Sequence, residues 1–187
     1  MLENIQNIDG SLLIKFQSFA IHDSLTPIAK IYTHLGDAGM MWIVIAILLL
    51  IFKHTRKYGI LMLASLALMY IVNNLLLKEL IDRTRPYEVF DKVQRLIEKQ
   101  RDPSFPSGHS ASSFAAAMCI YLNGSKKYGI PLLLLAFLMA LSRLYVGVHY
   151  PGDVVTGAIV GSLMAWLVYK VYDARQEALH PAKHRRR

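Results

Sequence analysis

A single cysteine, Cys119, means that no disulfide can form within the chain. Acidic residues are also few, with 13 Asp and Glu compared with 21 Lys and Arg, and charged residues make up only 18% of the sequence. The first residues lack the basic start, apolar core and small-residue cleavage site of a removable signal peptide. We expect neither a metal nor a cofactor, because no metal-ligand spacing occurs around His22, His34, His54, His180 and His184.

Apolar sequence, in contrast, is abundant, because 54% of the 187 residues are hydrophobic. Runs without a charged side chain cover residues 38–52, 58–77, 110–125, 128–142 and 154–169. None of the runs exceeds the ~20 residues that usually cross a bilayer, so polar flanks must extend the helices into the interface. This pattern predicts an all-α integral membrane bundle, a single domain over residues 1–187 with five transmembrane helices.

The N-terminal segment, residues 1–36, has a different character. It mixes apolar residues such as Leu13 and Phe16 with polar ones such as Lys15 and Gln17. This mixture is typical of an amphipathic helix lying in the membrane interface, and it also fits a short, poorly hydrophobic sixth span.

The distribution of charge predicts the orientation. If the five runs alternate across the membrane, one side holds Lys53, Arg56, Lys57, Lys126, Lys127, Lys170, Arg175, Lys183, Arg185, Arg186 and Arg187, accompanied only by Asp173 and Glu177. By the positive-inside rule that side is cytoplasmic. It includes a basic tail, residues 173–187, which we expect to meet anionic lipid headgroups and not nucleic acid.

Two cations follow the second apolar run on the opposite, extracytoplasmic side. Lys78 and Arg85 are seven residues apart, so they share a helix face if the helix continues to Thr84. Pro86 then forces Arg85 into an extended conformation and ends the helix. Cations beside lipid favour an anionic partner such as phosphate. The alternative is that both side chains snorkel to the surface and pair with Glu79 and Asp82.

A turn precedes the third run on the same side. Pro106 and Gly108 break the chain, and Ser107 is a good residue for starting a helix. Backbone N–H groups at such a start bind phosphate readily, and His109 could then protonate a leaving oxygen. The alternative is an N-capping turn with a solvent-exposed histidine.

The last segment joins the fourth run to the fifth. His149 and Asp153 are four residues apart, and Pro151 is suited to the first position of the fifth helix. Asp153 can then orient one imidazole nitrogen and leave the other as a nucleophile. A purely structural His–Asp cap would explain this pair, but it would leave Arg143 at the membrane edge without a partner.

Together the three segments resemble the type 2 phosphatidic acid phosphatase superfamily, which includes lipid phosphate phosphatases, bacterial acid phosphatases and the soluble vanadium haloperoxidases. The family pattern is complete here as Lys78…Arg85-Pro86, Pro106-Ser107-Gly108-His109 and Ser142-Arg143…His149…Asp153. The resemblance covers roughly residues 40–170, and no motif position departs from it.

The resemblance implies a role for each motif residue. His149 would attack phosphorus and become a phosphohistidine, Asp153 would orient it, and His109 would protonate the leaving group and later activate water. The phosphate oxygens would be held, without a metal, by Lys78, Arg85 and Arg143 and by the backbone of Ser107 and Gly108.

The segment between the first two motifs, residues 87–101, has apolar residues at helical spacing among charged ones. We expect an amphipathic helix here on the outer membrane surface, which either roofs the site or merely covers the helix ends.

These observations predict an enzyme of the plasma membrane that hydrolyses lipid phosphates or diphosphates on the extracytoplasmic side. Undecaprenyl diphosphate is the first choice of substrate, and phosphatidylglycerophosphate or phosphatidate is the alternative. The alternative from another functional class is a protein that binds or transports a lipid phosphate without turnover, although binding alone would not need two histidines.

Overall fold

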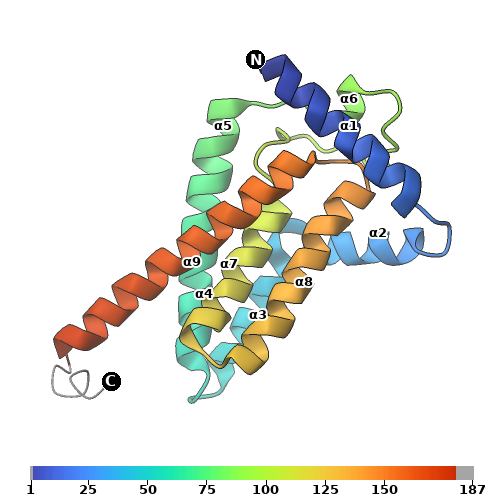
Figure 1. Ribbon diagram of the computed structural model, residues 1–187. Helices are drawn as coiled ribbons and strands as arrows, with labels where there is room; N and C mark the ends of the chain where they lie inside the picture. The colour runs from blue at the N-terminus through green and yellow to red at the C-terminus, as the bar shows by residue number, and fades with distance from the viewer. Residues whose placement is uncertain (1, 180–187) are drawn as a thin grey trace.

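The computed structural model describes residues 2–179, and all the regular elements in that range are helices. The centre of the bundle is α7 (Gly108–Asn123), which packs against α4 (Arg56–Met69), α8 (Lys126–Tyr145) and α9 (Pro151–Leu179), as Figure 1 shows. A further helix, α3 (Met40–Ile51), forms an antiparallel hairpin with α4. The predicted all-α bundle is therefore confirmed.

Small residues allow α7 and α9 to approach closely. A Cβ atom added to Gly157 would lie 2.4 Å from the carbonyl oxygen of Ser107, and one added to Gly161 would lie 2.1 Å from that of Ala111. Neither helix can carry a larger residue there without moving apart. This contact fixes the start of α7, which bears His109, beside the start of α9, which follows His149.

The second apolar run forms one continuous helical rod whose winding changes along its length. It begins as α4, becomes the π-helix η2 (Tyr70–Leu77) and ends as α5 (Lys78–Ile81). The helix does not reach Thr84, the condition under which Lys78 and Arg85 would share a helix face, because Asp82 adopts the left-handed conformation with φ of 41° and ends it. Arg85 is extended as predicted, with ψ of 150°, and the short helix α6 (Pro86–Val89) follows.

Among the described residues, three helices are long and apolar enough to cross a membrane, and a fourth span is present if a bent pair of helices counts as one. The three cover Arg56–Val89, Lys126–Tyr145 and Pro151–Leu179. The bent pair joins α2 (Thr26–Leu35) to η1 (Asp37–Gly39) and α3 at an angle of 49°. The chain is thus a membrane protein, while the count of five spans stays a prediction, because α7 has only 16 residues.

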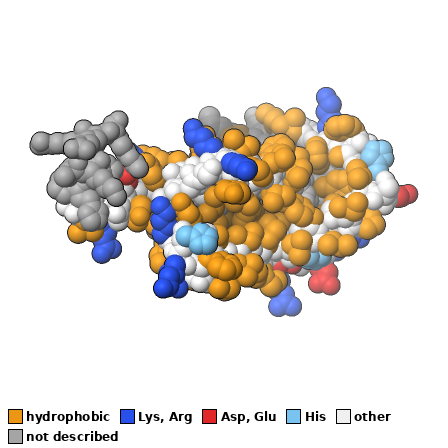
Figure 2. All heavy atoms as spheres, turned by 90° about the horizontal axis from the view of Figure 1, so that it is seen from below, with side chains coloured by type: hydrophobic (Ala, Val, Ile, Leu, Met, Phe, Trp, Pro, Cys, Tyr) orange, Lys and Arg blue, Asp and Glu red, His pale blue; other side chains and the backbone are white. Residues whose placement is uncertain are grey.

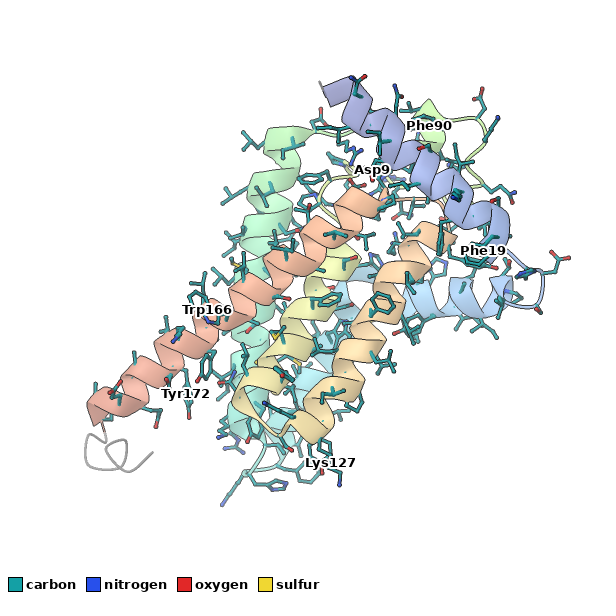
Figure 3. The ribbon with its side chains drawn as sticks, in the orientation of Figure 1. Asp9, Phe19, Phe90, Lys127, Trp166 and Tyr172 are labelled. Atoms are coloured by element: carbon teal, nitrogen blue, oxygen red, sulfur yellow. The ribbon has the colours of Figure 1, made fainter. Side chains whose placement is uncertain are left out.

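The N-terminal helix α1 (Leu2–Ala20) lies across the end of the bundle where the three motifs meet, and it is not among the candidate spans. Its inward side carries the buried residues Asp9, Leu13 and Gln17, and Figure 3 shows Asp9 toward the start of α9. Its outward side exposes Ile8 and Phe19. The helix therefore turns apolar side chains outward, as a helix at a lipid interface would.

The predicted amphipathic helix over residues 87–101 is wrong. Helix α6 ends at Val89, and the chain continues irregularly. The Gln17 side chain bonds both backbone groups of Gln94, and the N–H of Leu96 donates to the carbonyl of Val146. These distant partners replace helical hydrogen bonds. Leu96 and Ile97 pack on the loop before α9, and Val93 packs in a cluster with Leu13 of α1.

The far end of the bundle carries the turns between α3 and α4 and between α7 and α8. Hydrophobic side chains cover most of the face seen from below in Figure 2, with Lys and Arg around them. Helix α9 extends to Leu179 at this end, so residues 173–179 of the predicted basic tail are helical. Residues 180–187 lie outside the described part of the chain.

Candidate active site

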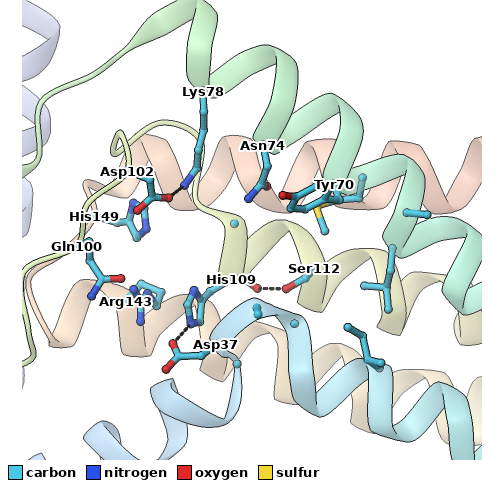
Figure 4. Close-up of a pocket in the computed structure, with 18 of the residues that line it drawn as sticks. Asp37, Tyr70, Asn74, Lys78, Gln100, Asp102, His109, Ser112, Arg143 and His149 are labelled. Atoms are coloured by element: carbon cyan, nitrogen blue, oxygen red, sulfur yellow. Dashed lines mark hydrogen bonds and ion pairs between the residues drawn. The ribbon is translucent and has the colours of Figure 1, made fainter.

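The three motif segments converge on one cavity of about 520 Å³ at the α1 end of the bundle (Figure 4). Its polar part is lined by Asp37, Asn74, Lys78, Arg85, Gln100, Asp102, Gly108, His109, Arg143 and His149. Every element that bears a motif thus contributes to one site. Of the predicted site residues, only Ser107 and Asp153 do not line the cavity directly.

Lys78 and Arg85 are buried, with 5% and 3% of their surface exposed, so they do not snorkel to the surface. Their partner is neither Glu79 nor Asp82 but Asp102, whose carboxylate pairs with Lys78 and lies 2.8 Å from an Arg85 guanidinium nitrogen. Burial alone would raise the pKa of Asp102, but the hydrogen bond from Lys78 and the nearby positive charges lower it to about 2. A carboxylate anion therefore sits where phosphate was expected.

Arg143 completes the set of cations. It is 1% exposed, one terminal nitrogen donates to Thr33 Oγ1 at 2.6 Å, and its Nε is buried without a hydrogen-bond partner among the described residues. A buried unpaired donor is costly unless a ligand uses it. The arrangement leaves a charged donor available to an anion in the cavity.

His149 and Asp153 meet as their spacing predicts. Nδ1 of His149 lies 3.4 Å from Oδ2 of Asp153, and both residues are buried. The Ser104 hydroxyl donates to the same carboxylate oxygen at 2.5 Å, and Arg83 holds the other oxygen at 2.7 Å. Because Nδ1 faces Asp153, the nitrogen that remains for chemistry at His149 is Nε2.

Arg83 also ties the N-terminal helix to this group. One of its guanidinium nitrogens lies 2.9 Å from Asp9, and the guanidinium stacks 3.8 Å above the Tyr150 ring. Asp9 in turn accepts the backbone N–H of Gly152 at the start of α9. Helix α1 therefore holds the backbone around His149 in place.

The start of α7 supplies His109, as predicted, with Ser107 as its N-cap. The backbone N–H of Ser107, which was predicted to bind phosphate, donates in this structure to the carbonyl oxygen of Asp153 at 3.0 Å. That bond links the α7 start to α9 instead. Gly108 does line the cavity, as its predicted role requires.

The rest of the cavity is apolar. Ile43 of α3 and Leu63, Leu66, Ala67, Met69 and Tyr70 of the second helical rod line it. Ile43 and Tyr70 are 38% and 53% exposed, so this wall reaches the surface that the bundle presents to lipid. The cavity thus has a cationic end and an apolar end, which matches an amphiphile with an anionic headgroup.

Sequence reasoning missed five residues: four contact motif residues directly, and the fifth, Asp9, contacts Arg83, which is one of the four. They are Asp9, Asp37, Arg83, Asp102 and Ser104. The available signal was the near balance of charge on this side of the membrane, since buried cations require anions close by. That signal indicates that anions accompany the buried cations, but it does not identify them.

The environment of His149 makes a testable prediction about its protonation. Burial first, and then the positive charges of Arg85 and Arg143, lower the pKa of His149 well below 6.5. The ring should therefore be neutral at pH 6, with protonation and loss of its nucleophilic nitrogen only at lower pH. Titration of ¹⁵N-histidine NMR signals in detergent, assigned with His149→Gln, would show this; a midpoint at or above 6.5 would contradict it.

Fold and site together define a membrane phosphatase for lipid substrates, and comparison with known proteins supports this class. The model of the PAP2 superfamily matches residues 58–177, and the chain belongs to that superfamily. This finding confirms the resemblance drawn from the motifs.

Three similar proteins show the range of the superfamily. The chain is 34% identical to an undecaprenyl-diphosphatase of Sulfolobus acidocaldarius over 165 residues, 88% of this chain and 78% of the relative. It is 30% identical to a lipid A 4'-phosphatase of Bacteroides thetaiotaomicron over 182 residues, which cover 90% of this chain and 79% of the relative. The crystal structure of a PAP2 type phosphatidylglycerolphosphate phosphatase from Bacillus subtilis superposes with a TM-score of 0.74 at 29% identity, covering 92% of this chain and 87% of that one. The protein is accordingly a lipid phosphatase.

Proposed function

We propose that this protein hydrolyses long-chain lipid phosphates or diphosphates through a phosphohistidine, and that undecaprenyl diphosphate is its principal substrate. The observation that carries the proposal is the cavity, with buried cations and two histidines at one end and an apolar wall open to lipid at the other. The similarity to an undecaprenyl-diphosphatase supports the choice of lipid. Similarity to other lipid phosphatases makes their substrates the alternatives to test.

The reaction begins when the terminal phosphoryl group enters the cationic end. Lys78, Arg85 and Arg143 take its oxygens, and the Asp102 carboxylate gives up its place between the first two cations. Phosphoryl transfer needs mainly positioning and charge stabilisation, which three fixed cations supply. The three cations neutralise the phosphate charge, as Mg²⁺ does in other phosphoryl-transfer enzymes.

In the chemical step, Nε2 of His149 attacks phosphorus and the bond to the leaving oxygen breaks. His109 gives its proton to that oxygen and then accepts a proton from the water that hydrolyses the phosphohistidine. Asp153, held by Arg83 and Ser104, keeps Nδ1 of His149 oriented. The products are inorganic phosphate and the lipid with one phosphate fewer, which is undecaprenyl phosphate when the substrate is undecaprenyl diphosphate, and the lipid stays in the membrane.

A substrate panel tests the proposal. Phosphate release in detergent micelles with EDTA is expected to be fastest from undecaprenyl diphosphate, slower from phosphatidylglycerophosphate and phosphatidate, and slowest from glucose 6-phosphate. Ala67→Trp, which places a large ring on the apolar wall, should slow the lipids and spare the sugar phosphate. Turnover of glucose 6-phosphate equal to that of the lipids, or strict dependence on Mg²⁺, would contradict the proposal.

The side of the membrane is part of the proposal, and we place the site on the extracytoplasmic face. In a Cys119→Ser background, Glu98→Cys near the site should react with an impermeant maleimide in intact cells. Lys126→Cys at the opposite end should react only after permeabilisation, since both positions are exposed in the protein. The reverse pattern would place the chemistry in the cytoplasm.

A further inference from the structure

The joint between α2 and α3 brings a carboxylate to His109. Nε2 of His109 lies 3.0 Å from one oxygen of Asp37, and the other oxygen lies 2.9 Å from Nδ1 of His34 (Figure 4 shows the first contact). The side chain of His109 is 14% exposed, whereas those of Asp37 and His34 are 48% and 55% exposed. The three side chains form a series that leads from the cavity to the surface.

The backbone of this joint is unusual. Ala38 has φ of 52° and Gly39 has φ of 70°, so two consecutive residues are left-handed, and one of them is not glycine. Gly36 lies so close to His109 that an added Cβ would be 2.7 Å from the imidazole Cδ2 atom. The chain thus adopts a costly conformation at the point where Asp37 meets the ring, and such strain gathers at functional sites.

The positive charges around His109 explain why its protonated form needs a nearby carboxylate. The cavity that His109 lines also holds Lys78 and Arg85, Arg143 from α8, and His149 from the loop before α9. The Asp102 carboxylate in that cavity is already engaged by the first two cations. A protonated imidazole would add a further positive charge to this group, so an acid at this position requires an anion of its own.

We infer that Asp37 is the positioning residue of the general acid, an inference that rests on the role proposed above for His109. Asp37 accepts the Nε2–H of His109, which leaves Nδ1 to carry the proton toward the leaving oxygen. As the bond from phosphorus to that oxygen breaks and the bond to His149 forms, the Nδ1 proton moves to the oxygen. His109 is then neutral, and its Nε2–H still donates to Asp37. His34 contacts the other oxygen of the Asp37 carboxylate on the surface side.

This role predicts a dependence on the leaving group. The leaving group of phosphatidate is an alcohol, which leaves poorly unless protonated. The leaving group of diacylglycerol diphosphate with the same acyl chains is phosphatidate, a phosphate monoester, which leaves readily without a proton. Asp37→Asn should lower kcat/KM for phosphatidate about tenfold or more beyond any loss with the diphosphate. The ratio kcat/KM is the right measure, because it ends at release of the leaving group and excludes the later hydrolysis of the phosphohistidine.

Matched variants separate the inference from a structural effect and from the proposed function. His109→Gln should show the same selective loss more strongly, and Asp37→Glu should retain part of the phosphatidate activity that Asp37→Asn loses. Asp23 is an exposed carboxylate in the α1–α2 turn, so Asp23→Asn should change kcat/KM for neither substrate. Equal losses on both substrates in Asp37→Asn, or no loss, would overturn the role of Asp37. If His109→Gln itself lacked the selectivity, the proposed acid would be wrong and the inference would fall with it.

Discussion

Replacing His149 with glutamine is expected to lower kcat by roughly 10⁴-fold or more, because the covalent route is lost while the residual binding site stays. The buried ring lies against Asp153 and faces the cavity with its other nitrogen. Brief reaction with ³²P-labelled lipid followed by an alkaline quench, in which phosphohistidine is stable, should label the wild-type protein and not His149→Gln.

The control for this experiment is His54→Gln, since His54 is an exposed histidine in the turn between α3 and α4, at the far end of the bundle. It should retain full activity and full labelling. Gel filtration in detergent shows whether each variant remains monodisperse. Activity of His149→Gln within tenfold of wild type would mean that another group attacks phosphorus.

Arg143→Gln is expected to lower kcat by about 10²- to 10³-fold, the usual effect of removing one fixed donor from a developing anionic charge. The side chain is buried, and its Nε has no hydrogen-bond partner among residues 2–179, so its charge is available to the substrate. Vanadate, which mimics five-coordinate phosphorus, should also inhibit the variant far less than the wild type.

Arg95→Gln provides the matched control, because Arg95 is exposed and its guanidinium lies over the Tyr87 ring outside the cavity. It should leave both turnover and vanadate inhibition unchanged. Thermal unfolding in detergent should be compared for both variants. If Arg143→Gln lost stability but kept the vanadate affinity of the wild type, Arg143 would be structural and would not bind phosphate.

Local patterns in the sequence determined much of the site. Pro151 and Ser107 begin the helices that they were predicted to begin, because proline suits the first helical position and serine caps free N–H groups. The pair His149 and Asp153 follows from a spacing of four residues across the start of α9. Alternation of the apolar runs placed all three motifs at one end of the bundle, where the structure has them.

Local pattern failed where distant partners decided the conformation. The segment over residues 87–101 has helical periodicity, yet its backbone bonds to Gln17 and Val146, which are about 50 to 80 residues away. Helix α5 likewise ends before Thr84, because Asp82 is left-handed. In the segment over residues 87–101, tertiary contacts outweighed a weak local preference.

The sequence by itself thus determined the membrane class, the superfamily and most of the motif residues that line the cavity, because each depends on composition or on spacing within one helix turn or loop. Only the tertiary structure decided which anions accompany the cations. Asp102 pairs with Lys78 across 24 residues, His109 meets Asp37 across 72, and Arg83 meets Asp153 across 70. No local pattern encodes such pairs, because a buried charge selects its partner through the packing of the whole bundle.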